Sequence, residues 1–186
     1  MHSLIKNSKI FKPIIHTIIT FVIIIGCISI FKGPYFIVVK YYAFNGNSKF
    51  KSKDFQGAID DYSKALSYDK SNIAVRVSRG SSYLDSKKYD EAISDYTEVI
   101  RIAPNDARPY AYRGRAHYEL GDTAKSIEDY NKAIRLDNTF GYAYMNRGLL
   151  KYTLMSDPSG VCADLKTALD LGMTEAQDLL DHGHCE

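Results

Sequence analysis

The chain has 186 residues, of which 25% are charged and 45% are apolar, an ordinary composition for one globular domain with a short extra segment. The net charge of +2 is uneven, because residues 1–34 hold four lysines and no acidic residue, whereas residues 35–186 hold 20 basic and 22 acidic side chains. Neither part has the clustered basic face of a nucleic-acid-binding surface, so we exclude that class of partner.

The first element along the chain is an uncharged run from Ile14 to Phe31, 18 residues long, with His16 as its main polar interruption. A helix that spans a membrane needs about 17–25 apolar residues. A buried helix of a soluble protein would show polar residues at helical spacing, and this run does not. Because lysines precede the run, it predicts a membrane segment that leaves the rest of the chain on the exported, periplasmic or extracytoplasmic side.

Two membrane interpretations remain open for residues 1–34. One is an uncleaved signal anchor that crosses the membrane once. The other is a lipoprotein signal, because Ile24, Ile25, Gly26 and Cys27 resemble a lipobox, in which the cysteine is lipidated. The residues that follow Cys27 stay apolar, and this favours the uncleaved anchor.

Internal repeats organise the rest of the chain. Three similar segments, AIDDYSKAL from Ala58, AISDYTEVI from Ala92 and SIEDYNKAI from Ser126, begin 34 residues apart. A fourth, VCADLKTAL from Val161, follows after 35 residues. Glycines recur upstream at the same period of 34, at Gly46, Gly80, Gly114 and Gly148. A period of this length predicts stacked copies of one supersecondary unit.

The residue types within each copy indicate how the units pack. A glycine in a helix is less favourable than an alanine by about 1 kcal/mol, so a recurring glycine predicts a close approach of two helices. The second half of each of the first three copies carries a small residue and, four positions later, a large aromatic residue that we expect to fill the space between units. These aromatic residues are Tyr62, Tyr96 and Tyr130.

The apolar spacing and the turn residues predict helix pairs separated by short connections. Asp54 and Asp122 are placed to cap second helices, Asp157 and Pro158 to begin the last one, and Gly172 to end it. The expected helices are 37–51 and 55–68, 73–85 and 89–102, 107–119 and 123–136, and 141–154 and 159–171, with a capping helix at 174–182.

This pattern resembles the tetratricopeptide repeat (TPR) over about residues 39–174. The second copy carries the TPR pattern at Gly80, Tyr83, Ala92, Tyr96, Val99 and Pro104. The resemblance implies an all-α, right-handed superhelical solenoid of about four hairpins and a C-terminal capping helix, preceded by the N-terminal transmembrane or signal helix. The expected parts are an anchor or signal at 1–34 and a TPR domain at 35–186, with repeats at about 39–72, 73–106, 107–140 and 141–175 and a cap at 174–186.

An acidic residue precedes the large residue of each second helix, and an arginine recurs 18 residues later. The acidic residues are Asp61, Asp95, Asp129 and Asp164, and the arginines are Arg79, Arg113 and Arg147. We expect ion pairs between adjacent repeats, namely Asp61–Arg79, Asp95–Arg113 and Asp129–Arg147. Pairing within a repeat, such as Arg79–Asp95, is the alternative.

The sequence has no glycine-rich phosphate loop, no His-Glu-x-x-His motif and no nucleophile elbow, so we expect no catalytic residue, no cofactor and no small-molecule substrate. His117 falls at a packing position. His182, His184 and Cys185 are interpreted as a chain end rather than as a metal site. On the exported side Cys162 and Cys185 are expected to form a disulfide, and the alternative is two reduced thiols in a cytoplasmic domain.

In the TPR family the first helices line a concave groove that holds an extended peptide or a helix. Carried over position by position, the resemblance implies a groove that is basic and polar at one end and aromatic and aliphatic at the other. Its residues are Lys40, Asn47, Lys51, Val77, Ser81, Asp85, Arg108, Ala111, Arg115, Tyr118, Tyr142, Met145, Leu149 and Tyr152.

Some TPR proteins clamp a C-terminal carboxylate with five Lys, Asn and Arg residues. Asn47 and Arg108 fall at two of these positions, whereas Ala43, Ser78 and Tyr112 depart from the other three, which argues against this kind of ligand. The resemblance therefore implies a membrane-tethered, non-enzymatic scaffold that binds another protein. The alternatives are a soluble TPR adaptor or co-chaperone, and a lipoprotein assembly factor of the bacterial cell envelope.

Overall fold

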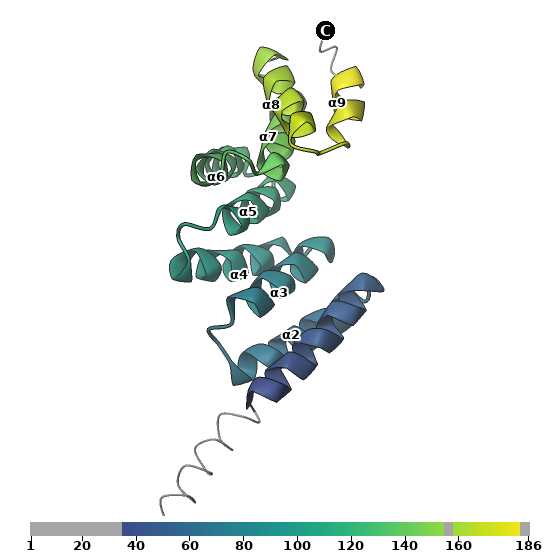
Figure 1. Ribbon diagram of the computed structural model, residues 1–186, viewed down its shortest axis with the longest axis vertical. Helices are drawn as coiled ribbons and strands as arrows, with labels where there is room; N and C mark the ends of the chain where they lie inside the picture. The colour runs from purple at the N-terminus through teal and green to yellow at the C-terminus, as the bar shows by residue number, and fades with distance from the viewer. Residues whose placement is uncertain (1–34, 155–157, 183–186) are drawn as a thin grey trace, which may run out of the picture.

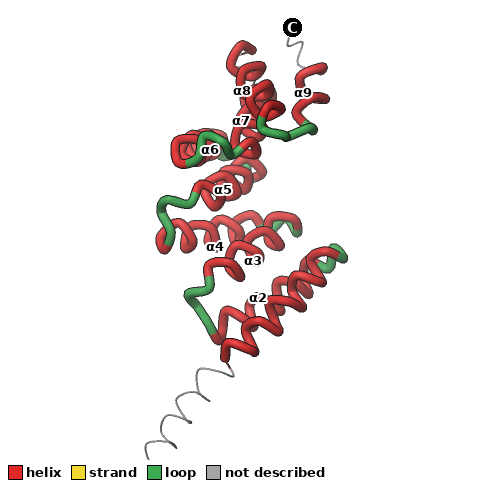
Figure 2. The backbone as a smooth tube through the Cα atoms, viewed as in Figure 1, coloured by secondary structure: helices red, strands yellow, loops and turns green. Residues whose placement is uncertain are grey.

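The computed structural model describes residues 35–154 and 158–182, and all regular structure within them is helical. The helices form antiparallel hairpins that stack along the long axis of the molecule, with the first hairpin at one end and α9 near the other (Figure 1). Short turns join the helices (Figure 2). The described elements are the helix at residues 35–51, α2 (Phe55–Tyr68), α3 (Ile73–Asp85), α4 (Tyr89–Ile102), α5 (Ala107–Glu119), α6 (Thr123–Leu136), α7 (Gly141–Thr153), α8 (Pro158–Asp170) and α9 (Ala176–His182).

The helix ends follow the expected capping chemistry. The Asp54 carboxylate accepts a hydrogen bond from the Gly57 amide at 2.9 Å, and Asp122 caps α6 through the Lys125 amide at 3.1 Å. Gly172, just after α8, has the left-handed φ of 88° that favours glycine at a helix end. The interpretation of Asp157 as a cap lies outside the described residues.

The close approach predicted from the glycines is confirmed. A Cβ on Gly80 would lie 2.9 Å from the Tyr96 ring, and one on Gly114 would lie 3.1 Å from the Tyr130 ring. Both rings are fully buried. Each glycine therefore admits the large residue of its own second helix, and this contact fixes the distance between the two helices of a hairpin.

The ion pairs expected between adjacent repeats are wrong, and the alternative pairing within a hairpin is found instead. Arg79 donates to Asp95 at 2.8 and 2.7 Å. The same pairs recur as Arg113–Asp129 and Arg147–Asp164. The reason is local: Arg79 directly precedes Gly80 and Asp95 directly precedes Tyr96, so the contact between Gly80 and Tyr96 brings their neighbours together.

The arginines nevertheless link adjacent hairpins through a different atom. Each Nη1 donates to a neutral side chain on the second helix of the preceding hairpin, at 2.6 to 3.1 Å. The acceptors are Ser63 for Arg79, Thr97 for Arg113 and Asn131 for Arg147. Asp61, which has no such arginine, forms an ion pair with Lys49 at 2.7 Å.

At the C-terminal end, α9 covers the last hairpin. Ala176 and Leu180 are buried and belong to one apolar cluster with Val161, Leu165 and Ala168 of α8. This agrees with the expected capping role, because an apolar solenoid end needs a cover. Cys162 on α8 is disulfide-bonded. Cys185 lies outside the described residues, so its pairing with Cys162 stays a prediction.

Within residues 35–154 and 158–182, no helix has the length and apolar character needed to cross a membrane. The predicted membrane segment from Ile14 to Phe31, with Cys27, lies outside the described residues, as does His184. These interpretations therefore stay predictions.

Candidate binding groove

The first helices of successive hairpins lie along the inner face of the stack. α3 contacts α5, and α5 contacts α7, whereas successive second helices among the described elements make no contact of that extent. Helices that approach each other on one side and separate on the other produce a curved stack. The inner face, carried by the first helices, is thus the place for a groove, as the resemblance implied.

Most of the residues predicted to line the groove are at least partly exposed. Those that are exposed are Lys40, Asn47, Lys51, Asp85, Arg108 and Tyr152; those that are half-buried are Val77, Ser81, Arg115, Tyr118, Tyr142, Met145 and Leu149. Ala111 is fully buried, so its predicted place in the groove is wrong. It packs in the apolar cluster with Tyr110 and Tyr130, because a small residue here admits the neighbouring helices.

The centre of the inner face carries a polar line that crosses three hairpins. The Nη2 atom of Arg115 on α5 lies 4.0 Å from the Oδ1 atom of Asp85 on α3. Tyr142 on α7 lies close enough to Arg115 to affect its titration. The Ser81 hydroxyl is 3.1 Å from the Tyr96 hydroxyl below it. At 4.0 Å the Arg115–Asp85 contact is longer than the Arg79–Asp95, Arg113–Asp129 and Arg147–Asp164 pairs, so the Arg115 guanidinium keeps donor capacity for a ligand.

A cluster of aromatic side chains surrounds Tyr142, the last residue of this polar line. Tyr112 lies 5.4 Å from Tyr142 and 5.6 Å from Tyr96, measured between ring centroids. Phe140 packs on two of these rings, at 5.8 Å from Tyr142 and 6.5 Å from Tyr112. Sequence reasoning placed Tyr112 at a carboxylate-clamp position of the TPR family but did not count it among the groove residues, and it missed Phe140. Tyr112 stands at the repeat position where the preceding copy has the polar Ser78.

The surroundings of Tyr142 determine the protonation state of its phenol. Burial raises the pKa of the Tyr142 phenol, while the neighbouring Arg115 acts in the opposite direction. The phenol therefore stays protonated at neutral pH and can donate a hydrogen bond to a ligand. Arg115 keeps its charge, so the centre of the groove offers a neutral donor beside a cation.

The two ends of the inner face differ. At the C-terminal end Tyr152 is exposed, whereas Met145 packs against the cluster around Leu165 and is less available than its predicted role required. At the N-terminal end Asn47 accepts a hydrogen bond from the buried Tyr62 hydroxyl at 2.7 Å, so part of its polar capacity is already used. The helix at 35–51 also exposes Phe44, which sequence reasoning missed.

The described residues hold no group of three or more His, Cys, Asp and Glu side chains that could bind a metal ion. Burial lowers the pKa of His117 from its ordinary value of 6.5. It is half-buried on α5, near Asp129 and Arg113, and fits a packing role rather than proton transfer. The arrangement can bind a ligand through charge, hydrogen bonds and aromatic faces.

Comparisons with known proteins agree with this geometry. A family model described as TPR repeat matches residues 80–121 and 114–154. No curated protein matches the sequence. The family model and the similar structures together support a TPR family protein.

Three solved structures illustrate the similarity. A thermophilic TPR protein of Thermus thermophilus has a TM-score of 0.70 and 16% identity, over 78% of this chain and 81% of that chain. The MamA protein has a TM-score of 0.63 and 22% identity, over 78% and 86%. The second TPR domain of human RPAP3, in complex with the HSP70 peptide SGPTIEEVD, has a TM-score of 0.60 and 25% identity, over 63% and 98%.

Proposed function

We propose that this protein is a membrane-tethered scaffold that binds an extended peptide or a helix of a partner protein on the inner face of its hairpin stack. The observation that carries the proposal is the line of Asp85, Arg115 and Tyr142, which places an anion, a cation and a phenol on three successive first helices. A ligand that follows the stack meets all three. Tyrosine and arginine are also the residue types enriched where binding energy concentrates.

The ligand we propose carries an acidic group for Arg115 and an apolar side chain for the surface around Tyr152. It is not a chaperone tail of the kind held by the RPAP3 domain. At three of the five positions that clamp a terminal carboxylate, this chain has Ala43, Ser78 and Tyr112, and the Tyr112 ring is held among Tyr96, Phe140 and Tyr142. The peptide SGPTIEEVD should therefore bind no better than the same peptide with an amidated C-terminus.

The tether is proposed from the sequence alone. The run from Ile14 to Phe31 is long enough to cross a bilayer, and the lysines before it favour export of the repeats. A tether raises the effective concentration of any partner in the same membrane, which suits a scaffold of modest affinity. After alkaline carbonate washing of native membranes, the chain should stay in the pellet, and its release would contradict the tether.

The groove can be tested with a displayed peptide library selected against the full-length chain in detergent micelles. Selected peptides should bind Arg115→Ala and Tyr152→Ala at least about tenfold more weakly, a change of ~1.4 kcal/mol. Glu128→Ala, which alters an exposed residue of the second helix α6, is the matched control and should bind normally. Equal affinity for all three variants would place the binding surface elsewhere.

A further inference from the structure

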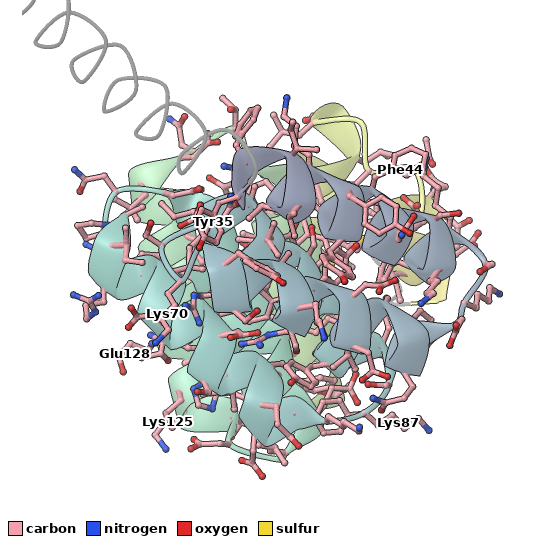
Figure 3. The ribbon with its side chains drawn as sticks, turned by 90° about the horizontal axis from the view of Figure 1, so that it is seen from below. Tyr35, Phe44, Lys70, Lys87, Lys125 and Glu128 are labelled. Atoms are coloured by element: carbon pink, nitrogen blue, oxygen red, sulfur yellow. The ribbon has the colours of Figure 1, made fainter. Side chains whose placement is uncertain are left out.

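The first described helix exposes an apolar surface at the end of the stack. Phe36, Ile37, Tyr41 and Phe44 are 61%, 66%, 60% and 71% exposed, and we call these four residues the terminal face. They recur at helical spacing on one side of the helix. The opposite side, with Val39 and Gly46, is buried against the first hairpin. Figure 3 views this end, with the helix at 35–51 and α2 in front of the other helices.

Within the terminal face, Tyr41 is exposed at a position that is buried in the other copies, whereas Phe36 and Ile37 stand at positions that are exposed in every copy but hold polar residues or proline elsewhere. Tyr41 occupies the repeat position of Val75, Pro109 and Ala143, and all three of these are buried. Nothing in the described residues covers Tyr41. The other end of the stack is covered by α9, and a stable solenoid needs a polar or covered residue set at both ends. The terminal face therefore requires a cover, and its large aromatic residues are poorly suited to water.

The charge of the helix at 35–51 and of the turn after it indicates which kind of partner covers the terminal face. Residues 35–53 contain four lysines and no acidic residue, although residues 35–186 as a whole are slightly acidic. Lys40, Lys51 and Lys53 are exposed, and the Lys40 ammonium lies 4.3 Å from the centre of the Phe36 ring. Aromatic residues with interspersed lysines are typical of a helix that lies in the interface of an anionic membrane.

The position of the terminal face in the chain points to the same partner. Only Lys32, Gly33 and Pro34 separate the run that ends at Phe31 from the helix at 35–51. A segment that leaves a bilayer at Phe31 delivers the next residues to the interfacial region, where tyrosine and other aromatic residues are enriched. Glycine and proline at this point favour a change in chain direction.

We propose that the terminal face lies in the headgroup region of an anionic membrane, so that the first hairpin rests on the bilayer and the stack extends away from it. The inference rests on the tether proposed above. It adds that the helix at 35–51 contacts lipid. The repeats are then held in a fixed orientation relative to the membrane rather than by a flexible linker. Lipid, rather than another hairpin, then covers the position of Tyr41.

The chain contains no tryptophan, so a single introduced tryptophan reports its own surroundings. The full-length Phe44→Trp variant is reconstituted in vesicles of equal parts phosphatidylcholine and phosphatidylglycerol, with or without bromine on the acyl chains. The matched control is Leu120→Trp, because Leu120 is 47% exposed at the turn between α5 and α6. For Phe44→Trp we expect a blue-shifted tryptophan emission, most of whose intensity is lost with brominated lipid. For Leu120→Trp we expect neither the blue shift nor the loss of intensity.

Two results would overturn the inference while leaving the tether in place. If Phe44→Trp floats with the vesicles but is quenched by aqueous iodide and not by brominated lipid, the face lies in water. If its emission is blue-shifted, insensitive to brominated lipid and accompanied by concentration-dependent cross-linking, a second copy of the chain covers the face. A chain that fails to float with the vesicles refutes the tether and the inference together, while peptide binding in the groove remains separately measurable.

Discussion

Arg113 donates two hydrogen bonds to the carboxylate of Asp129 within its own hairpin, at 2.9 and 2.8 Å. A third, of 3.1 Å, reaches Thr97 on the preceding hairpin. The same three-way contact recurs at Arg79 and Arg147. One arginine per repeat therefore fixes both the geometry of its hairpin and its alignment with the one before, as expected for a solenoid stabilised by nearest-neighbour interfaces.

The first prediction concerns these arginine–aspartate pairs. Asp129 is nearly buried, so Asp129→Asn leaves the Arg113 charge without its partner and should lower the free energy of unfolding by about 2–4 kcal/mol. Urea unfolding followed by circular dichroism measures the change. The control is Arg101→Ala, which removes an exposed pair with Glu98 and should leave the midpoint unchanged. Equal effects of the two variants would show that the Arg113–Asp129 pair does not stabilise the fold.

The second prediction concerns the glycine contacts. Gly80→Ala should improve helix propensity yet lower the free energy of unfolding by about 1–3 kcal/mol, because the new Cβ meets the buried Tyr96 ring. Tyr96→Ala removes the ring that the Cβ meets, whereas a leucine would not be small enough, because a Cβ on Gly148 would still lie 3.0 Å from Leu165. In a double-mutant cycle the two changes should therefore cost less together than the sum of their separate costs. Strict additivity would contradict the contact.

The third prediction concerns the turn inside each hairpin. Lys53, Lys87 and Gly121 occupy the same repeat position and have left-handed φ values of 64°, 62° and 81°. Only glycine adopts this conformation without steric cost, so Lys87→Gly should raise the free energy of unfolding by about 0.5–1 kcal/mol. Thermal unfolding measures it. Lys88→Gly, at the next residue, is the control and should give no increase.

The fourth prediction concerns pH. Burial lowers the pKa of His117 below 6.5, so the folded chain binds a proton at His117 less readily than the unfolded chain does. The stability that this residue contributes is complete above about pH 6.5 and is lost as the pH falls through the lowered pKa. The urea midpoint should decline between about pH 7 and 5 in the wild type and decline less in His117→Gln. Parallel profiles would contradict the assignment.

The fifth prediction concerns the disulfide at Cys162. A link between Cys162 and Cys185 closes a loop of about 23 residues and should contribute roughly 3 kcal/mol. Reductant and Cys185→Ser should lower the thermal midpoint equally, and reductant should have no further effect on Cys185→Ser. A reductant effect that survives in Cys185→Ser would mean that Cys162 pairs with Cys27 or with a cysteine of a second copy of the chain.

The sequence alone determined the repeat, the approximate helix ranges and the glycine positions at which helices approach closely. Each of these depends on a spacing that recurs, such as that from Gly80 to Tyr96, or on a local interaction, such as the cap that Asp54 provides. Periodicity reveals such features because every copy repeats them, and a local hydrogen bond needs no knowledge of distant residues.

Only the tertiary structure decided which partner each side chain takes and what remains uncovered. Arg79 lies a similar number of residues from Asp61 and from Asp95, and the close packing of α3 on α4 selected Asp95. Tyr41 proved to be exposed, although Val75, Pro109 and Ala143 at the same repeat position are buried. The physical reason is that burial depends on which hairpin stands on either side, and the repeat period carries no information about where the stack ends.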